Sequence, residues 1–363
     1  MSLSIAYLCV SPLREGQAGY THVNQIIKGL RSLNRNVELY AVPAEASQKP
    51  LIIRISQMLL TQIRLIWSLS SYDVLYIRAH FVTLPTILFA KITKIPVVLE
   101  INGPYQDLFL AWPFTRYFSF FFIMLMKYMM RLSDSIIVVT PQLKNWVIKE
   151  IGNRDIYVIP NGADVEHFFP DAQNDFHIDK DYAIFFGALA VWQGIEDILK
   201  ATKEDQWPDN LLLVIAGEGM KEDEVIRYEK DNENIKYLGV VPYQMIPGLI
   251  AESVASFACM NNVDQRSDTG LSPIKLFESL ACGVPVIVTE LPGLSNFVKE
   301  NDCGVIVPLN SPKSIADAVN KLYGDKEFRN RLAENGLNIV TKEHSWYQRA
   351  VDTDQIILNT IKQ

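Results

Sequence analysis

Cysteine is scarce in this sequence, and its arrangement excludes two classes of small domain. The four cysteines lie far apart, and no two of them form a CxxC pair. This spacing matches neither a zinc-binding motif nor the dense framework of a disulfide-rich secreted domain. The first residues also lack the charged region and the apolar core of a secretion signal. We therefore expect a protein of the reducing cytoplasm.

Long apolar runs are absent as well, which argues against a membrane-spanning helix. Such a helix needs roughly 20 consecutive apolar residues. The segment 114–130 comes nearest, but Arg116 and Lys127 interrupt it. The net charge of -7 gives no general attraction to nucleic acid, whose binding needs clustered Lys and Arg. Nucleic acid is therefore not an expected partner.

What the sequence does contain is a repeated alternation of short apolar runs with longer amphipathic stretches. Hydrophobic residues make up 49% of the 363 residues, which is enough for two cores of ordinary size. In the first half, the apolar runs predict strands at 5–10, 37–42, 74–77, 96–101 and 135–139. In the second half, they predict strands at 182–186, 211–216, 235–238, 255–258, 284–288 and 304–307. This alternation is typical of parallel sheets with crossover helices.

Turn-forming residues are concentrated at 161–181, and we place a hinge between two domains there. The expected domains are 1–165 and 166–345. Ligands are expected at the carboxyl ends of the strands, in a cleft between the domains. The predicted fold class is α/β, with two Rossmann-like, doubly wound domains that face each other across this cleft.

The segment 269–288 has the residues of a ligand-binding loop followed by a helix and a strand. Pro273 lies in the first turn of the predicted helix and Gly283 just past its end, which is the usual asymmetry. The N–H groups and the dipole at the helix start favour an anion such as a diphosphate. Lys275 adds a positive charge, and Glu278 lies where a carboxylate accepts both hydroxyls of a ribose. The alternative for Glu278 is an exposed residue on the solvent face.

This segment resembles the donor-site signature of the retaining GT-B glycosyltransferases of family 4 (glycosyl transferases group 1). In that family two glutamates are separated by seven residues, and the second matches Glu278. The first falls at Gly270, so backbone groups of Gly270, Leu271 and Ser272, or the nearby Asp268, would have to contact the sugar. The resemblance implies catalytic roles for Lys275 and Glu278.

The loop after the first strand of the second half also resembles this family, in which an Arg and a Lys there neutralise the departing diphosphate. Ala188 and Gln193 occupy the matching positions. Gly187 still permits close backbone approach, and Gln193 donates a neutral hydrogen bond, unless it serves loop packing alone. Because lost positive charge slows departure of the nucleotide, Lys275 and Arg266 are the candidate replacements.

Further glycine loops resemble the remaining donor-site loops of the family. Gly217 and Gly239 follow the next two strands, and the resemblance places the nucleotide base against the backbone of Gly239, Val240 and Val241. In the N-terminal half, Gly19 resembles the glycine that approaches the donor phosphates. The helix that follows it adds free N–H groups.

The strand at 96–101 ends where many relatives carry a histidine that contacts the donor sugar. This chain has Glu100 and Asn102 instead, and we expect one of them to position the acceptor hydroxyl or to act as its base. A simple turn at Asn102 is the equal alternative. Arg78, at the end of the neighbouring strand, is a further candidate. His22 is interpreted as a packing or capping residue rather than a base.

Two helical segments of the N-terminal half, 51–67 and 114–131, combine a wide apolar face with basic residues, as interfacial helices do. The basic residues are Arg54, Arg64, Arg116, Lys127 and Arg131. The alternative is that both helices pack on the sheet. The excess of Phe and Met favours a lipid-linked acceptor, and peripheral contact with the inner face of the membrane follows as a hypothesis.

The resemblance implies a GT-B enzyme in which residues 346–363 form a helix that crosses back to the N-terminal domain. It implies a retaining glycosyltransferase of hexosyltransferase type. The expected donor is a UDP- or GDP-sugar, and the expected acceptor is a glycan or lipid-linked glycan in surface polysaccharide synthesis. We expect no metal site and no required cofactor. Two alternatives stay open: a nucleotide-sugar epimerase on the same fold, and a non-catalytic nucleotide-sugar-binding or scaffold protein.

Overall fold

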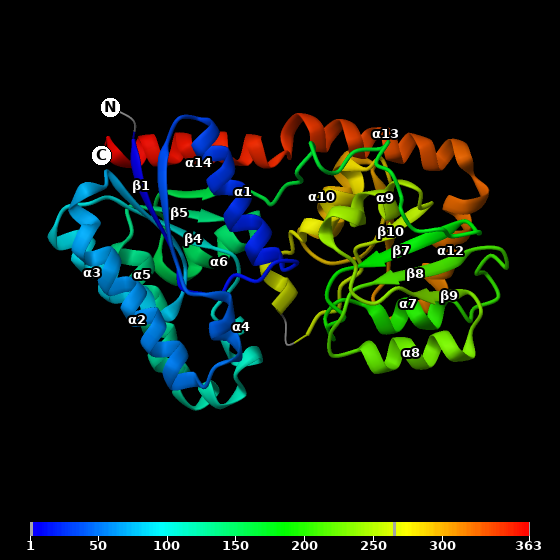
Figure 1. Ribbon diagram of the computed structural model, residues 1–363, viewed down its shortest axis with the longest axis horizontal. Helices are drawn as coiled ribbons and strands as arrows, with labels where there is room; N and C mark the ends of the chain where they lie inside the picture. Colours follow the sequence, from blue (N-terminus) through cyan, green and yellow to red (C-terminus); the bar gives the residue numbers. More distant parts are fainter. Residues whose placement is uncertain (1–2, 264–265, 363) are drawn as a thin grey trace. The chain divides into compact units, whose positions relative to one another are not determined.

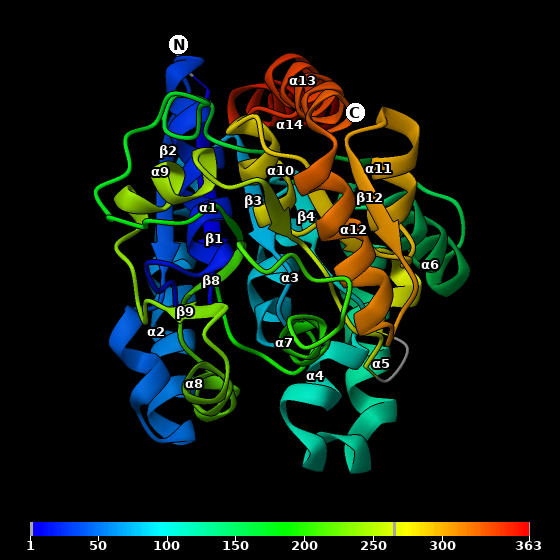
Figure 2. The same cartoon turned by 90° about the vertical axis from the view of Figure 1, so that its right-hand side faces the viewer.

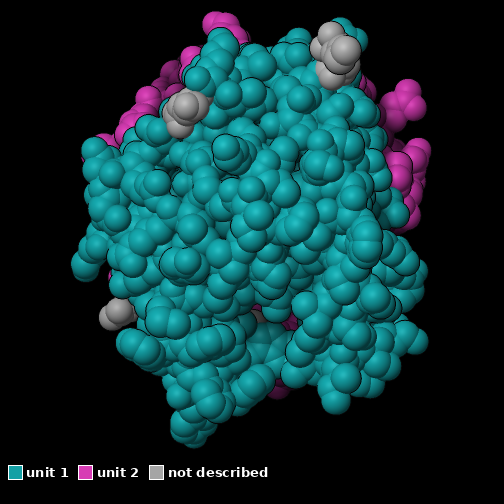
Figure 3. All heavy atoms as spheres, turned by 90° about the vertical axis from the view of Figure 1, so that its left-hand side faces the viewer, with its two compact units in different colours: residues 1–160, 347–363 teal, residues 161–346 magenta. Residues whose placement is uncertain are grey.

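The chain divides into two compact units, each built on one parallel sheet (Figure 1). The computed structural model describes residues 3–263 and 266–362, apart from the side chains of Ala111 and Arg266. Unit 1 comprises Met1–Pro160 and Tyr347–Gln363, and unit 2 comprises Asn161–Trp346 (Figure 3). Each sheet has six strands, which confirms the α/β class with two Rossmann-like domains.

The sheet of unit 1 has the strand order β2-β1-β3-β4-β5-β6. Its strands are β1 (Ser4–Cys9), β2 (Asn36–Ala41), β3 (Val74–Arg78), β4 (Val97–Ile101), β5 (Ser135–Val138) and β6 (Ile156–Val158). The first five agree with the predicted strands. The sequence did not predict β6, which is only three residues long. The strand order reverses between β1 and β3, and doubly wound sheets bind ligands at the carboxyl ends beside such a reversal.

Helices and short 3-10 turns connect the strands of unit 1. They are α1 (Ala18–Ser32), η1 (Ala44–Gln48), α2 (Leu51–Ser68), η2 (Leu69–Ser71), η3 (Phe81–Thr83), α3 (Leu84–Ile92), α4 (Gln106–Ala111), η4 (Pro113–Phe118), α5 (Ser119–Leu132) and α6 (Pro141–Ile151). The predicted helix over 114–131 is thus divided into η4 and α5. The last helix, α14 (Trp346–Ile361), also packs on this unit, because Arg35 donates two hydrogen bonds of 2.7 Å to Asp354.

The sheet of unit 2 has the order β12-β11-β10-β7-β8-β9 and reverses between β7 and β10. Figure 2 labels β8, β9 and β12 of this sheet. Its strands are β7 (Tyr182–Phe186), β8 (Leu212–Ala216), β9 (Ile235–Tyr237), β10 (Ala255–Phe257), β11 (Val286–Thr289) and β12 (Gly304–Val307). Its helical elements are α7 (Ile195–Ala201), α8 (Glu222–Asp231), η5 (Tyr243–Met245), α9 (Ile246–Ala251), η6 (Arg266–Thr269), α10 (Ile274–Ala281), α11 (Leu294–Asn301), α12 (Pro312–Gly324) and α13 (Lys326–Glu343).

Side chains that alternate along β7 build the two cores of unit 2. Ile184 and Phe186 belong to one core, with Phe277 of α10, whereas Ala183 and Phe185 belong to the other. Because both faces of β7 are covered, its sequence is an unbroken run of apolar residues. Helix α10 is buried along its whole length, so the polar side chains on it are buried too.

Candidate functional site

Three glycines lie at neighbouring strand ends on the carboxyl edge of unit 2. Gly187 N–H donates to Ala216 O at 2.9 Å, and Gly217 N–H donates to Gly239 O at 2.7 Å. Gly217 has a φ of +145°, and a Cβ there would lie 1.9 Å from the Gly187 carbonyl oxygen. Only glycine fits at this position. The glycine at position 217 is therefore required by the close packing of the two loops that follow β7 and β8.

The expected base-contact residues follow β9 on the same edge. The side chain of Val240 is exposed, and that of Val241 is partly buried against the core. The hydroxyl of Tyr237 donates to the Gly217 carbonyl oxygen at 2.8 Å. This hydrogen bond ties the loop after β8 to the end of β9.

The ammonium of Lys275 lies beside this glycine edge. Its Nζ donates to Gln193 Oε1 at 2.8 Å and lies 4.2 Å from the ring centre of Phe185. A Cβ on Gly187 would lie 3.6 Å from the same nitrogen. In the part of the chain that the structure describes, Gln193 is its one hydrogen-bond acceptor. Burial lowers the pKa of Lys275 to about 7, although nearby Glu278 opposes that shift.

Glu278 lies one turn further along α10 and is 5% exposed. This burial excludes the alternative of an exposed solvent-face residue. The Tyr243 hydroxyl donates to Glu278 Oε1 at 2.9 Å. Burial raises the pKa of Glu278 to about 7, against the opposing effects of this hydrogen bond and of Lys275. The sequence did not point to Tyr243, because a tyrosine 35 residues away carries no spacing signal.

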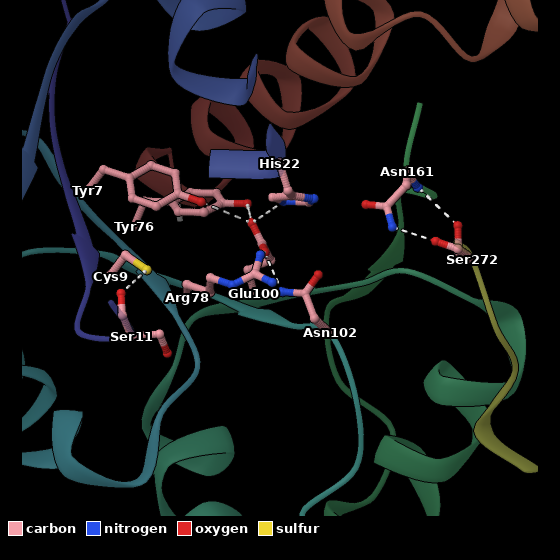
Figure 4. A network of polar contacts seen from close by, with 10 residues as sticks. All are labelled: Tyr7, Cys9, Ser11, His22, Tyr76, Arg78, Glu100, Asn102, Asn161 and Ser272. Carbon is pink, nitrogen blue, oxygen red and sulfur yellow. Dashed lines mark hydrogen bonds and ion pairs between the residues drawn. The ribbon is translucent and has the colours of Figure 1, made fainter. Parts of the chain in front are cut away.

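The loop that precedes α10 is held firmly within unit 2. The N–H groups of Gly270 and Leu271 donate to protein carbonyl oxygens at 2.9 and 3.0 Å. Asn161 holds Ser272: its N–H donates to Ser272 Oγ at 3.2 Å, and its Nδ2 donates to Ser272 O at 2.5 Å (Figure 4). Sugar recognition by the N–H groups of Gly270 and Leu271 would have to break these bonds. The side chain of Arg266 lies outside the described residues.

In unit 1, a buried carboxylate lies next to the reversal between β1 and β3. Glu100 of β4 is 1% exposed and is paired in register with Arg78 of β3. Its Oε1 accepts hydrogen bonds from Arg78 Nη1 at 2.8 Å and from Asn102 Nδ2 (Figure 4). The structure therefore brings together the three polar residues that the sequence placed at these strand ends.

The other oxygen of Glu100 has three partners. Oε2 accepts from the hydroxyls of Tyr76 at 2.7 Å and Tyr7 at 3.3 Å, and His22 Nε2 lies 3.0 Å from it. Burial opposes ionisation of Glu100, but His22, Arg78 and the adjacent asparagine outweigh it and hold its pKa well below the usual range. A carboxylate so stabilised is a weak base, so the geometry favours a positioning role. Tyr7 and Tyr76 gave no sequence signal, because they lie inside apolar strands.

Gly19 is the second residue of α1, and the start of this helix has no side-chain cap. A Cβ on Gly19 would meet nothing within 4 Å. The packing of unit 1 therefore does not itself require glycine here. A role in close approach by a ligand stays a prediction.

Unit 1 exposes large apolar side chains on α2, η4 and α5. Trp67, Tyr117 and Phe120 are each more than 80% exposed. Both α2 and α5 contact α3, and the Arg54 guanidinium lies 5.4 Å from the Trp112 ring centre. The structure thus leaves much of the apolar face uncovered. We call the exposed residues of α2, η4 and α5 the apolar surface.

Exposed basic residues accompany the apolar surface. Arg64, Arg116 and Arg131 are exposed, whereas Lys127 forms an ion pair with Glu150 at 2.8 Å. Among the residues that the structure describes, no helix is long and apolar enough to cross a membrane.

The sequence holds two Asp-x-Asp triplets, at 179–181 and 352–354. In the first, Asp179 pairs with exposed His177 at 2.8 Å. In the second, Asp354 binds Arg35. Across residues 3–263 and 266–362, no group of three or more His, Cys, Asp or Glu could hold a metal ion.

Two family models match adjacent parts of the chain. The model described as "Glycosyl transferases group 1" matches residues 170–338, and "Glycosyltransferase Family 4" matches residues 21–167. An uncharacterized glycosyltransferase of Methanocaldococcus jannaschii is 28% identical over 222 residues. That match covers 61% of this chain and 58% of the relative's length, so the chain spans less than two thirds of it.

Two solved structures share the fold over almost the full length of the chain. Sucrose-phosphate synthase of Thermosynechococcus elongatus has a TM-score of 0.78 at 13% identity, with 99% of both chains covered. HepE of Anabaena, in complex with UDP and glucose, has a TM-score of 0.72 at 15% identity, with 98% of this chain and 99% of that chain covered. At this identity, the similarity concerns the fold alone.

Proposed function

The chain belongs to the family 4 glycosyltransferases (group 1), and from this premise we propose that it transfers a hexose with retention of anomeric configuration. The donor is a UDP- or GDP-sugar bound by unit 2. The acceptor is a glycan or lipid-linked glycan bound by unit 1, in surface polysaccharide synthesis. The complex of the Anabaena protein with UDP and glucose supports a nucleotide-sugar donor.

The buried ammonium of Lys275 is the observation that carries this proposal. Among the described residues, its one hydrogen-bond acceptor is the neutral Gln193, so none of them supplies a counter-ion at hydrogen-bond distance, and an unpaired buried charge is costly. A diphosphate on the neighbouring glycine edge supplies that counter-ion. As the bond to the sugar breaks, Lys275 stabilises the negative charge that develops on the leaving group. It thus replaces the basic residues that are absent at Ala188 and Gln193.

Glu278 is suited to the nucleotide half of the donor. Tyr243 holds Oε1, and this fixes the carboxylate on α10. Ribose hydroxyls donating to this carboxylate favour its ionised form. The nucleotide base then lies against the backbone of Gly239, Val240 and Val241. The proposed reaction requires neither a metal ion nor a cofactor.

Donor binding tests the proposal directly. A thermal-shift panel would include UDP, GDP, ADP and dTDP with their sugars, on wild type, on Glu278→Ala and on the control Glu300→Ala, which is exposed on α11. We expect one nucleotide to stabilise wild type and the control, and to lose this effect in Glu278→Ala. If none stabilises the folded wild type, the proposal is wrong.

Two other functions are distinguished by turnover. The absent first glutamate, at Gly270, favours a non-catalytic nucleotide-sugar-binding or scaffold protein, which would bind donor without product on any acceptor. An epimerase would convert the donor with no acceptor present. A transferase releases one nucleotide for each acceptor that it glycosylates. Proton NMR of the new glycosidic bond then reports whether the anomeric configuration is retained or inverted.

We place the lipid-linked acceptor and a peripheral contact with the inner membrane face at the apolar surface of unit 1. Its exposed Arg64, Arg116 and Arg131 are expected to attract anionic headgroups. Co-sedimentation with phosphatidylglycerol vesicles tests this. The double variant Tyr117→Ser, Phe120→Ser is expected to lose binding. Tyr347→Ser, which changes an exposed tyrosine of α14, is the control. Equal binding by all three proteins would contradict the contact.

A further inference from the structure

Arg78 and Asn102 lie side by side on one oxygen of Glu100. Arg78 Nη1 donates to Oε1 at 2.8 Å, and Asn102 Nδ2 donates to the same oxygen (Figure 4). Arg78 is the last residue of β3, and Asn102 follows the adjacent strand β4. The pair therefore lies at the carboxyl edge of the sheet, beside the reversal where doubly wound sheets bind ligands.

The hydrogen-bonding capacity of this pair is mostly unused. A guanidinium has five N–H donors. In the described part of the chain, Arg78 donates only to Glu100, and the side-chain oxygen of Asn102 accepts no hydrogen bond. Arg78 is 19% exposed and Asn102 is half-buried, so a ligand at the edge can reach both. Glu100 itself is already surrounded by five donors.

Glu100 is held in place from inside the sheet. The hydroxyls of Tyr7 and Tyr76 donate to its second oxygen, and the two rings are stacked with centres 4.7 Å apart. Both tyrosines are buried. The ring pair therefore fixes the carboxylate, and the carboxylate fixes Arg78 and Asn102.

Stability alone does not account for this arrangement. Apolar residues of similar volume often stabilise a protein as well as a buried ion pair does, or better. Side chains held in one orientation instead favour binding, because less freedom is lost when a ligand arrives. The unused donors of Arg78 point to a ligand with at least two acceptor oxygens, since a guanidinium matches planar or tetrahedral oxyanions in pairs.

We propose that Arg78 and Asn102 form a subsite in unit 1 for a phosphate group of the acceptor, with Glu100 as its positioning residue. This inference rests on the proposed transferase function. Two N–H groups of Arg78 donate hydrogen bonds to two phosphate oxygens. The side-chain oxygen of Asn102 accepts a hydrogen bond from a neighbouring hydroxyl of the acceptor. A soluble sugar phosphate and a lipid-linked phosphate offer the same chemistry.

Binding of simple phosphates tests the subsite. Calorimetry would use glucose 1-phosphate against glucose, and farnesyl phosphate against farnesol in detergent, with the nucleotide that binds unit 2 present at saturation. We expect phosphate-dependent binding that is at least tenfold weaker in Arg78→Gln than in wild type. Binding is expected to be less reduced in Arg78→Lys, which keeps the positive charge but lacks the paired N–H donors of a guanidinium. Arg227→Gln, exposed on α8 of unit 2, is the matched control.

The two probes also separate the possible sources. Tighter binding of farnesyl phosphate assigns the group to a lipid, and tighter binding of glucose 1-phosphate assigns it to a soluble sugar. Equal binding to wild type and Arg78→Gln overturns the proposal. If Arg78→Gln folds poorly, Asn102→Ala keeps both charges and is expected to bind glucose 1-phosphate a few-fold more weakly; unchanged binding there overturns the proposal too.

Nucleotide binding on the same samples separates this inference from the proposed function. Normal nucleotide stabilisation without any phosphate-dependent binding rejects the subsite alone. Absence of nucleotide stabilisation in wild type rejects the proposed function. Loss of nucleotide stabilisation in Arg78→Gln would assign this residue to the donor and would overturn the acceptor subsite.

Discussion

Both units bury charged side chains, Glu100 on strand β4 of unit 1 and Lys275 and Glu278 on helix α10 of unit 2, but the surroundings of these charges differ. In unit 1, five donors surround Glu100, and His22, Arg78 and Asn102 among them hold its pKa low against the effect of burial. Within the described residues of unit 2, Lys275 has one neutral hydrogen-bond acceptor and Glu278 one hydrogen-bond donor. Burial therefore moves both pKa values to about 7.

This difference separates a charge that is satisfied by the protein from one that awaits a ligand. A carboxylate with five donors is stable as it stands, and its role is to orient its neighbours. A buried amine with a single acceptor is a functional candidate, because perturbed pKa values concentrate at binding sites. Two units with the same kind of parallel sheet can thus differ in this respect. Unit 1 holds a charge that its own side chains satisfy, and unit 2 holds charges that a ligand can satisfy.

The largest expected effect is on the stability of unit 1. Glu100→Ala leaves the Arg78 charge without its partner and is expected to lower the free energy of unfolding by about 3 kcal/mol, as breaking a buried ion pair does. Differential scanning calorimetry measures it, with Glu45→Ala as the exposed control in η1. A change no larger than that of the control would mean that the network is not structural.

Lys275→Met tests the opposite prediction for unit 2. Turnover is expected to fall by roughly 10²- to 10³-fold, the usual cost of losing a group that stabilises transition-state charge. Stability is expected to rise, because an apolar side chain replaces an uncompensated buried amine. Lys299→Met, exposed on α11, is the control for both measurements. Full activity in Lys275→Met would remove this residue from the mechanism.

The pH dependence of stability sharpens the comparison further. The folded pKa of Lys275 is about 7, below its ordinary 10.5, so its unfavourable contribution is relieved as pH rises from 7 to 10.5. The folded pKa of Glu278 is about 7, above its ordinary 4.5, so its favourable contribution is lost as pH rises from 4.5 through 7. The pair therefore predicts a stability minimum of unit 2 near pH 7.

Thermal unfolding between pH 5 and pH 9 measures this minimum. Glu278→Gln is expected to keep only the rise above pH 7, and Lys275→Met only the fall below it. A wild type whose unit 2 stability is flat across this range would show that the two groups do not titrate near neutrality.

The smallest expected effect concerns Tyr243. Tyr243→Phe removes one hydrogen bond to Glu278 and keeps the ring, so nucleotide affinity is expected to fall about fivefold, or roughly 1 kcal/mol. Calorimetric titration measures it, with Tyr228→Phe on α8 as the control. An unchanged affinity would mean that the carboxylate is fixed by α10 alone.

Much of the fold and part of the site could be read from local patterns. Apolar runs predicted eleven of the twelve strands found in the described residues, because strands covered on both faces have continuous hydrophobic sequences. The missed strand, β6, has only three residues. Lys275 and Glu278 could be placed together because a spacing of three residues puts them on neighbouring turns of one helix.

The contacts that set the chemistry could not be read in this way. Gln193 meets Lys275 across 82 residues of chain. Tyr76 reaches Glu100 from the middle of a strand in which it resembles any other apolar residue. The sequence left open whether the helical segments 51–67 and 114–131 pack on the sheet, and in the structure many of their large apolar side chains are exposed.

By itself, the sequence determined the family, the two parallel sheets and the loops that carry the polar residues, because periodicity, glycines and spacing are local properties of a chain. Only the tertiary structure decided which of those residues are buried and what faces them. Burial and the number of hydrogen-bond partners set whether a charge is stabilised, as at Glu100, or left for a ligand, as at Lys275. Those two quantities depend on side chains that lie far away in the sequence.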